Sequence, residues 1–240
     1  MDERYLQKPS RTAFDALADR YDQWYESAEG SVILREELAC LRLLCPECQR
    51  RWLEVGVGTG RFASEMGIAK GIDPSPKMLE YAAQRSIRTH LGNAENLPFP
   101  TGMFDGVLMA FTLCFVQDAR QALRESARIL RPSGTFLLGV IPADSSWGRL
   151  YARKAAEGHP IYSHAIFRTI SATVALAEGE GFALRESAST LFWSPGDAPA
   201  GEVRIERHAD EDAGFAALRF EKRRIDDSSG SIPMEGQYDK

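Results

Sequence analysis

The chain has 240 residues, of which 44% are apolar and 26% are charged. This is the composition of an ordinary globular protein, which excludes disordered and fibrous classes, and the length fits one large domain or two small ones. The formal net charge of −5 provides no excess of positive charge for a phosphate backbone, so we expect no nucleic-acid partner.

The sequence also argues against a membrane partner and against export. The longest nearly uncharged apolar run, residues 106–116, is far shorter than the roughly 20 residues of a membrane-spanning helix. The first residues, MDERYLQKPSR, carry charges where a secretory signal is apolar. We therefore expect a cytoplasmic protein, in which the four cysteines are free thiols.

Two segments near the N-terminus are predicted to be helical. Apolar residues recur at helical spacing along residues 14–21 and again along 34–44. Because these segments precede the first predicted strand, residues 1–50 are expected to form a helical cap.

From Arg51 onward, short apolar runs alternate with segments of helical period, which is the signature of βαβ units. The runs are nearly continuously apolar, as in parallel strands that helices cover on both faces. Strands are predicted over residues 52–57, 67–73, 87–92, 104–111 and 134–141.

The predicted helices between these strands carry their own start signals. Ser75 followed by Pro76 caps a helix over residues 77–85. Asp118 begins a second helix, which is expected to end at Pro132. A later helix and two further strands are predicted over residues 171–180, 183–193 and 215–221.

Two segments fall outside this alternation. Residues 142–168 form a long, aromatic-bearing excursion of the kind that often serves as a substrate lid. Residues 226–240 contain too few apolar side chains to pack and are predicted to be a disordered tail.

The most informative stretch is LEVGVGTGRFA, residues 53–63. Gly56, Gly58 and Gly60 predict a tight turn after the first strand, with a backbone that a ligand can approach closely. A dinucleotide fingerprint read from the first of these glycines would require a small residue where Arg61 stands. No GxxxxGK[ST] phosphate loop is present either, so nicotinamide and triphosphate cofactors are disfavoured.

A carboxylate follows at the end of the second predicted strand. Asp73 lies 17 residues after Gly56, where a carboxylate can accept both hydroxyls of an adenosine ribose. Residues 92–95, after the third strand, bring amide and carboxyl groups to the same edge. The pattern therefore predicts a ribose-containing ligand rather than a phosphate.

The motifs LEVGVGTGRFA, GIDPSPKML, GNAENLPF, FDGVLMAFTLCFV and RILRPSGTFLLGVI resemble those of class I S-adenosylmethionine-dependent methyltransferases, in the branch with the ubiquinone and menaquinone biosynthesis enzymes. The resemblance is dense over residues 51–141 and less specific in FDALADRYDQWYES and in residues 147–182. It implies a Rossmann-like, doubly wound α/β fold. The seven-stranded sheet would be mostly parallel, with an antiparallel last strand, helices on both faces and an N-terminal helical cap.

The resemblance also implies S-adenosyl-L-methionine as the cofactor. Glu54 and the glycine loop would surround its methionine half, and Asp73 would hold the ribose hydroxyls. Glu95 would flank the adenine, Asn93 stands where many relatives have Asp, and Phe111 would border the site of methyl delivery. The predicted cofactor-binding residues are Glu54, Gly56, Gly58, Thr59, Gly60, Asp73, Pro74, Asn93, Ala94, Glu95 and Phe111.

The acceptor side is defined less sharply. Tyr21 and Tyr25 share a helical face, for which core packing is the alternative to pocket lining. The substrate-pocket candidates are Tyr21, Trp24, Tyr25, Trp147, Tyr151 and His164. Transfer from a sulfonium requires placement more than acid–base chemistry, and no catalytic base can be named.

No metal site is predicted. Cys45 and Cys48 form a CxxC pair, but a structural zinc site needs four ligands and no second pair follows. Structural thiols are the favoured interpretation of this pair, and a redox or metal role and soft-substrate handling are the alternatives.

We therefore predict one domain over residues 1–225, with a cap (1–50), a cofactor-binding core (51–141), a lid-like insertion (142–168) and a C-terminal helix and strands (169–225). The predicted function is S-adenosylmethionine-dependent, in-line methyl transfer to an unidentified small-molecule substrate. One alternative is a non-catalytic S-adenosylmethionine sensor or partner subunit. The other is a nicotinamide-dependent oxidoreductase, which Arg61 and the GxGxG spacing disfavour. The oligomeric state is left open.

Overall fold

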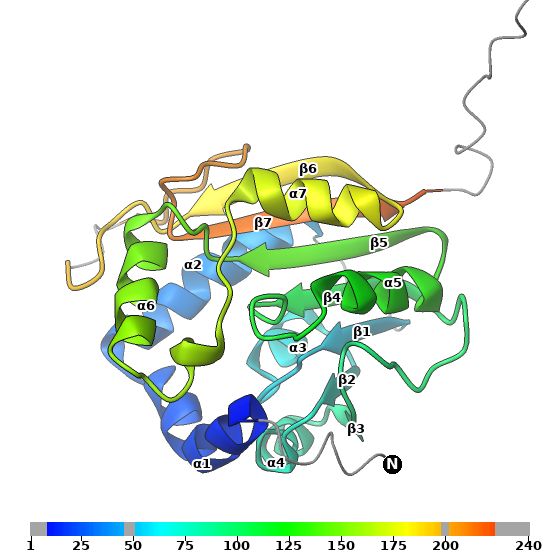
Figure 1. The fold of residues 1–240 in the computed structure, drawn as a ribbon, viewed down its shortest axis with the longest axis horizontal. Coiled ribbons are helices and arrows are strands. Elements are labelled where there is room, and N and C mark those ends of the chain that lie inside the picture. The colour runs from blue at the N-terminus through cyan, green and yellow to red at the C-terminus, as the bar shows by residue number, and fades with distance from the viewer. Residues whose placement is uncertain (1–8, 46–50, 198–201, 224–240) are drawn as a thin grey trace, which may run out of the picture.

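The computed structural model describes residues 9–45, 51–197 and 202–223. Its centre is a seven-stranded sheet with the strand order β3-β2-β1-β4-β5-β7-β6 (Figure 1). The strands are β1 Trp52–Val55, β2 Lys70–Asp73, β3 Arg88–Leu91, β4 Phe104–Ala110, β5 Leu130–Val140, β6 Phe182–Thr190 and β7 Phe215–Lys222.

The strand directions confirm the predicted fold class. Strands β1 to β5 pair in parallel, and β7 runs antiparallel between β5 and β6. Leu53, Val107 and Leu138 in the central strands are completely buried, as expected for strands covered on both faces. The antiparallel strand at the C-terminal end of the chain is the one that the family resemblance implied.

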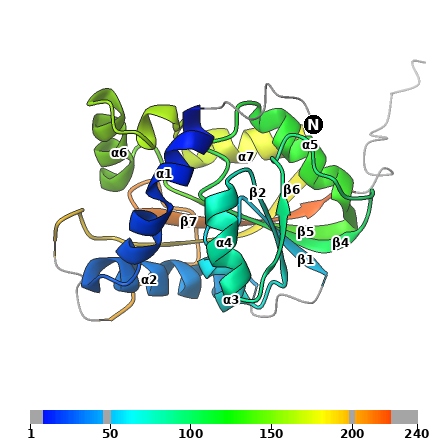
Figure 2. The same ribbon diagram turned by 90° about the horizontal axis from the view of Figure 1, so that it is seen from below.

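Helices cover both faces of this sheet (Figure 2). One face packs against α2, α3 and α4, and the other packs against α5 and α7. Figure 1 shows α1 and α6 at the edge where the parallel strands end. The helices are α1 Pro9–Trp24, α2 Ala28–Leu44, α3 Arg61–Met66, α4 Pro76–Gln84, α5 Ala119–Ile129, α6 Ser146–Ala156 and α7 Ile170–Gly179, with a short 3₁₀ helix η2 Tyr162–His164.

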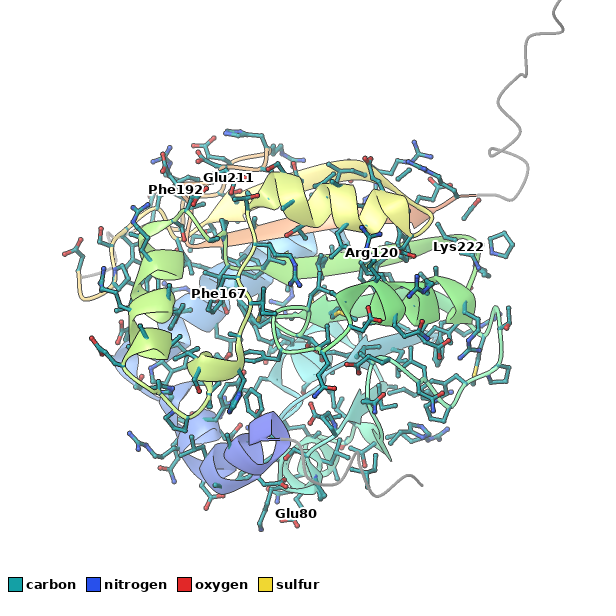
Figure 3. The ribbon with its side chains drawn as sticks, viewed as in Figure 1. Glu80, Arg120, Phe167, Phe192, Glu211 and Lys222 are labelled. Atoms are coloured by element: carbon teal, nitrogen blue, oxygen red, sulfur yellow. The ribbon has the colours of Figure 1, made fainter. Side chains whose placement is uncertain are left out.

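The second face is held together partly by charge. Figure 3 shows Arg120 of α5 projecting toward α7, where its Nη1 lies 2.8 Å from Oε1 of Glu180. Arg124 of α5 contacts the same carboxylate. Both arginines are exposed, so dissolved salt screens their attraction to Glu180. These contacts therefore orient α5 relative to α7 more than they stabilise the fold.

The fifth strand begins earlier than predicted. α5 ends at Ile129, before Pro132, and β5 continues directly from Leu130. Ser133 has a φ of 59°, and the register between β4 and β5 shifts at this point. The predicted turn at Pro132 is therefore an irregular start of the strand.

The excursion after β5 contains a helix that the sequence pattern did not indicate. α6 begins after Ser145, whose hydroxyl accepts a hydrogen bond from the backbone N–H of Gly148 at 2.9 Å. Trp147 is buried, and its Nε1 donates to the carbonyl of Trp193 at 2.8 Å. These two contacts fix α6 over the ends of the strands.

None of the helices in the described part of the chain has the length and hydropathy of a membrane span. The predicted disordered tail, residues 226–240, lies outside the described residues, as does Cys48 of the CxxC pair. Cys45 is buried at the end of α2.

A stripe of acidic residues attaches the cap helix α1 to the core. Asp15, Asp19 and Asp22 are spaced by four and three residues, so they lie along one face of α1. That face contacts α4: Asp15 accepts a hydrogen bond from the Ser75 hydroxyl, and Asp19 accepts one from the Tyr81 phenol at 2.8 Å. The stripe therefore fixes how α1 is rotated over the sheet edge.

The last member of the stripe makes the strongest of these contacts. Asp22 accepts from Nε and Nη2 of Arg61 at 2.9 and 3.0 Å, and from Nη2 of Arg85 at 3.0 Å. Burial would raise the pKa of Asp22, but the hydrogen bonds from Arg61 and Arg85 outweigh it and hold the pKa below 3.8. Arg85 also donates to the carbonyl of Thr59 at 3.0 Å, so the cap is tied to the glycine loop.

We expect Asp22→Asn to lower the free energy of unfolding at pH 7 by about 1–3 kcal/mol, because it weakens charge-assisted hydrogen bonds that are largely shielded from water. Since the pKa of Asp22 is lowered in the folded protein, the advantage of the wild type is complete above the unfolded pKa of about 3.9 and shrinks as the pH falls below it. Urea unfolding at pH 7 and pH 3 measures both effects. The exposed Asp19→Asn on the same helix is the matched control, and equal losses for the two variants would contradict the assignment.

Candidate functional site

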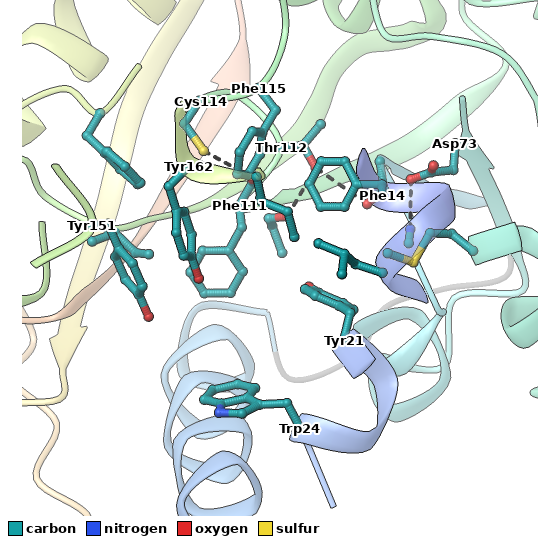
Figure 4. Close-up of a pocket in the computed structure, with 18 of the residues that line it drawn as sticks. Phe14, Tyr21, Trp24, Asp73, Phe111, Thr112, Cys114, Phe115, Tyr151 and Tyr162 are labelled. Atoms are coloured by element: carbon teal, nitrogen blue, oxygen red, sulfur yellow. Dashed lines mark hydrogen bonds between the residues drawn. The ribbon is translucent and has the colours of Figure 1, made fainter. Parts of the chain in front are cut away.

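A cavity of about 900 Å³ lies at the edge where the parallel strands end (Figure 4). The loops after β1, β2, β3 and β4 line one side of it, and α1, α2, α6 and η2 line the other. The strand order reverses direction between β1 and β4, and ligands of open α/β sheets bind at such a switch point. The fold therefore places the cavity where this architecture binds its ligands.

The three loop glycines serve different purposes. All have positive φ values, of 72°, 52° and 82°, which a side chain would strain. A Cβ at Gly56 would overlap Thr112, and a Cβ at Gly60 would come within 2.9 Å of the Ala82 backbone. A Cβ at Gly58 would meet no atom within 4 Å, and this residue lines the cavity. Gly58 therefore exposes bare backbone to a ligand, whereas the other two allow close packing.

Asp73 lies at the end of β2, beside this loop. Its Oδ2 accepts from the N–H of Gly58 and its Oδ1 from the N–H of Ser75, both at 2.9 Å, and Figure 4 shows the carboxyl at one end of the cavity. Burial raises its pKa to about 6, although the hydrogen bonds from Ser75 and Gly58 act in the opposite direction. The carboxylate is thus oriented, and further donors from a ligand would stabilise its charge.

The segment after β3 adds polar groups to the same end of the cavity. Asn93, Ala94 and Glu95 all line it. The side-chain oxygen of Asn93 is buried and accepts no hydrogen bond from the described residues. Glu95 accepts from the backbone N–H of Gln117 at 2.9 Å, which joins this segment to the loop after β4. A buried acceptor without a donor is typical of a position that a ligand completes.

Three of the predicted cofactor residues support the loop from behind. Glu54 points to the first turn of α3, where the backbone of Ala63 donates to its carboxyl, and burial raises its pKa well above 4.5. Thr59 and Gly60 are buried in the turn. The predicted residues that line the cavity are Gly56, Gly58, Asp73, Pro74, Asn93, Ala94, Glu95 and Phe111, whereas Glu54, Thr59 and Gly60 do not.

The other half of the cavity is walled by aromatic rings (Figure 4). Among the substrate-pocket candidates, Tyr21, Trp24, Tyr25, Trp147 and Tyr151 line it. His164, the last residue of η2, is exposed and does not line the cavity. His159, which precedes η2, does line it. Sequence reasoning could not distinguish the two histidines, because the excursion had no predicted helix to set their directions.

The rings hold one another in place. Tyr21 packs edge-on against Tyr25 with ring centroids 5.4 Å apart, and their hydroxyls lie 3.3 Å from each other. On the opposite wall, Tyr151 packs against Tyr162 with centroids 4.4 Å apart. Burial raises the pKa of the Tyr162 phenol and that of the Cys114 thiol to about 12. Neither group is therefore a ready base near pH 7.

The sequence reasoning missed several lining residues. They are Phe14, Glu37, Phe115, Lys154 and His159, whereas Tyr162 and Phe167 line the cavity as aromatic residues of the excursion that the sequence had offered as candidates. A signal existed for Glu37, because it lies one helical turn from both Ile33 and Leu41 and therefore falls on the apolar face of α2. Within the described residues, no group of three or more His, Cys, Asp or Glu side chains could hold a metal ion.

Comparison with known proteins agrees with the fold. Residues 53–138 match the model of the family described as "Methyltransferase domain". A solved structure from Thermotoga maritima, described as a SAM-dependent methyltransferase and a possible histamine N-methyltransferase, shares 30% identity with a TM-score of 0.81, covering 89% of this chain and 100% of that one.

Curated relatives include an uncharacterized protein and a methyltransferase. An uncharacterized protein of Mycobacterium tuberculosis is 38% identical over 210 residues, which cover 88% of this chain and 74% of that protein. The demethylmenaquinone methyltransferase of Deinococcus radiodurans is 33% identical over 145 residues, covering 55% of this chain and 60% of that enzyme. The chain belongs to the S-adenosylmethionine-dependent methyltransferases, and S-adenosyl-L-methionine is the cofactor of this family.

The residues present fit this cofactor. The bare backbone at Gly58 leaves room for a ligand against the loop, Asp73 is oriented for hydroxyl donors, and the oxygen of Asn93 lacks a donor. The nicotinamide alternative has no support in these comparisons.

We expect Gly58→Ala to weaken S-adenosylmethionine binding by about tenfold or more, because the new methyl group would project into the space beside the loop. The positive φ of Gly58 should also cost about 1–2 kcal/mol of stability. Gly181→Ala is the matched control, since Gly181 also has a positive φ and open space around its Cβ position but does not line the cavity. Urea unfolding should show a similar loss of stability in both variants. Calorimetric titration should show weaker S-adenosylmethionine binding only for Gly58→Ala.

Proposed function

We propose that this enzyme catalyses in-line methyl transfer from S-adenosylmethionine to a small-molecule acceptor held in the aromatic half of its cavity. The observation that carries this proposal is the continuity of a single cavity, which joins Gly58 and Asp73 at one end to Tyr21 and Tyr151 at the other. A cofactor and an acceptor that share one cavity can be aligned, and alignment is the main contribution a protein makes to such a transfer.

On the cofactor side, each of these residues would hold a defined part of S-adenosylmethionine. Asp73 would accept the two ribose hydroxyls, and Gly58 would lie against the methionine half. Asn93 and Glu95 would border the adenine, with the unpartnered oxygen of Asn93 as an acceptor for its amino group. When bound, the cofactor supplies a methyl group on a positively charged sulfur, which is a good leaving group.

On the acceptor side, the cap and the insertion would act as lids. α1 and α6 stand across the strand ends, and their rings line the cavity, so they would shield the space beside Phe111 from water. Single-ligand pockets span about 300–1,000 Å³, and a cavity of about 900 Å³ holds the cofactor with room for only a small second molecule. The size of the cavity thus favours a small acceptor over a macromolecule.

We expect Asp73→Asn to weaken S-adenosylmethionine binding about 10- to 100-fold, because charge-assisted hydrogen bonds are worth about 1.5–3 kcal/mol. Ribose hydroxyls donate better to a carboxylate than to a neutral carboxyl. Since burial raises the pKa of Asp73 to about 6, the affinity of the wild type should fall as the pH drops from 7 to 5.

Calorimetric titration at pH 5, 6 and 7 measures both effects. The affinity of Asp73→Asn should not follow this pH profile. Asp105→Asn, at the opposite end of β4, makes the same chemical change away from the cavity and should bind like the wild type. Unchanged affinity for Asp73→Asn would remove its proposed role with the ribose.

Turnover separates the enzyme from a cofactor sensor. We expect the wild type to bind S-adenosylmethionine and its demethylated product but not NAD, and to form the demethylated product when offered the right acceptor. Mass spectrometry of both products, with amine, thiol, quinol and arsenite or tellurite acceptors, detects this directly. Tight binding of S-adenosylmethionine without turnover on any class would favour the sensor, and tight binding of NAD alone would contradict the proposal.

A further inference from the structure

Two carboxyl groups among the described residues that line the cavity are buried, and only one of them is satisfied. Asp73 accepts two backbone hydrogen bonds at the cofactor end. Glu37 of α2 lines the same cavity with 5% of its surface exposed, and its Oε2 accepts no hydrogen bond from the described residues. Native proteins rarely leave a buried carboxyl oxygen without a donor, so this one points to a ligand.

The described neighbours of Glu37 do not supply a positive charge to pair with its carboxyl group. Tyr21 and Tyr25 from the cap and Tyr151 from α6 lie close enough for its charge to raise their pKa values, and these groups are neutral phenols. On its own helix, the Cys40 thiol also has a raised pKa, of about 12. None of the ion pairs found among the described residues includes Glu37.

The adjacent residue in the same helix, Glu36, has hydrogen-bond partners within the protein. Oε2 of Glu36 accepts from the hydroxyl of Thr190 and from Nε1 of Trp193, both at 3.4 Å. Glu36 also raises the pKa of Glu37, although burial is the larger cause. Of the two adjacent buried carboxyls, that of Glu36 is bonded within the protein, and that of Glu37 has an unpartnered oxygen and belongs to a residue that lines the cavity.

None of the basic groups that line the cavity forms an ion pair with Glu37 among the described residues. Arg20 is exposed on α1. Nζ of Lys154 lies 5.5 Å from the ring centre of Tyr151 and 5.8 Å from that of Tyr162. Burial and the nearby Lys154 and Arg20 lower the pKa of His159, so this imidazole is neutral at pH 7. The aromatic half thus holds a buried acid and no cation paired with it among the described residues.

We propose that the acceptor carries a protonated amine, which pairs with Glu37 between the rings of Tyr21, Tyr25 and Tyr151. This inference rests on the proposed function and names the substrate class of the same site. The faces of aromatic rings attract cations, most strongly where water is excluded. Burial favours the neutral form of Glu37, and of the possible acceptors only a cation would stabilise its ionised form, whereas an anionic or neutral acceptor would leave the carboxyl protonated.

Binding measurements with matched probes test this without relying on turnover. Wild-type protein, saturated with the demethylated cofactor product, is titrated with phenethylamine, phenethyl alcohol and phenylacetate, and then with further primary amines and their matched alcohols and carboxylates. We expect amines to bind more tightly than their matched probes, and Glu37→Gln to weaken amine binding about 10- to 100-fold with little effect on the alcohols.

Proton release gives a second readout that a purely structural role would not change. Because the pKa of Glu37 is raised in the empty cavity, pairing with an ammonium group should drive a proton off its carboxyl. Calorimetry at pH 6 in two buffers of different ionisation enthalpy measures this proton. We expect release on phenethylamine binding in the wild type, and none in Glu37→Gln.

The controls separate this inference from the proposed function. Glu37→Gln should fold normally, because Gln keeps the shape of the neutral carboxyl group that burial favours, and its S-adenosylmethionine affinity should equal that of the wild type. Glu29→Gln makes the same change at the exposed rim of α2 and should keep the amine preference. If no amine binds more tightly than its matched alcohol, or if carboxylates bind best, the role of Glu37 is overturned while the methyltransferase stands. Failure to bind S-adenosylmethionine would overturn the proposed function itself.

Discussion

The carboxylate of Asp22, held between Arg61 and Arg85, is the contact on which the shape of the cavity depends. Arg61 begins α3 immediately after the glycine loop, and Arg85 caps α4 while donating to the loop carbonyl of Thr59. One side chain at the end of the cap helix therefore joins the cap to both helices that flank the loop. A small residue at position 61, as in a dinucleotide site, could not make this connection.

This connection decides which residues of α1 face the ligands. The acidic stripe of Asp15, Asp19 and Asp22 faces α4, which turns Phe14 and Tyr21 toward the cavity. A helix docked by apolar contacts alone can rotate at modest cost, whereas three directional polar contacts at successive turns permit one rotation. The aromatic wall of the site is therefore a consequence of polar docking on the opposite face of the same helix.

The features of the structure that could be predicted from the sequence are those that depend on the pattern of residues within a short segment. The strands, the loop at Gly58 and Asp73 follow from periodicity and spacing within short segments, and the structure has them within a few residues. The orientation of the excursion after β5 depends on tertiary contacts such as that of Trp147 with Trp193, which no local pattern contains. This is why α6 was missed and why His159 rather than His164 reaches the cavity.

Asp73 and Glu37 show how one cavity can distinguish two kinds of ligand. Burial opposes the charge of both carboxyls, so each gains free energy when a ligand donates to it. At Asp73 the backbone already supplies two hydrogen-bond donors, so neutral hydroxyl groups of a ligand would be enough to stabilise its charge further. At Oε2 of Glu37 the described residues supply none, so a positively charged ligand would be needed to stabilise its ionised form. The number of donors that the fold supplies at each end thus sets the charge of the ligand that end accepts.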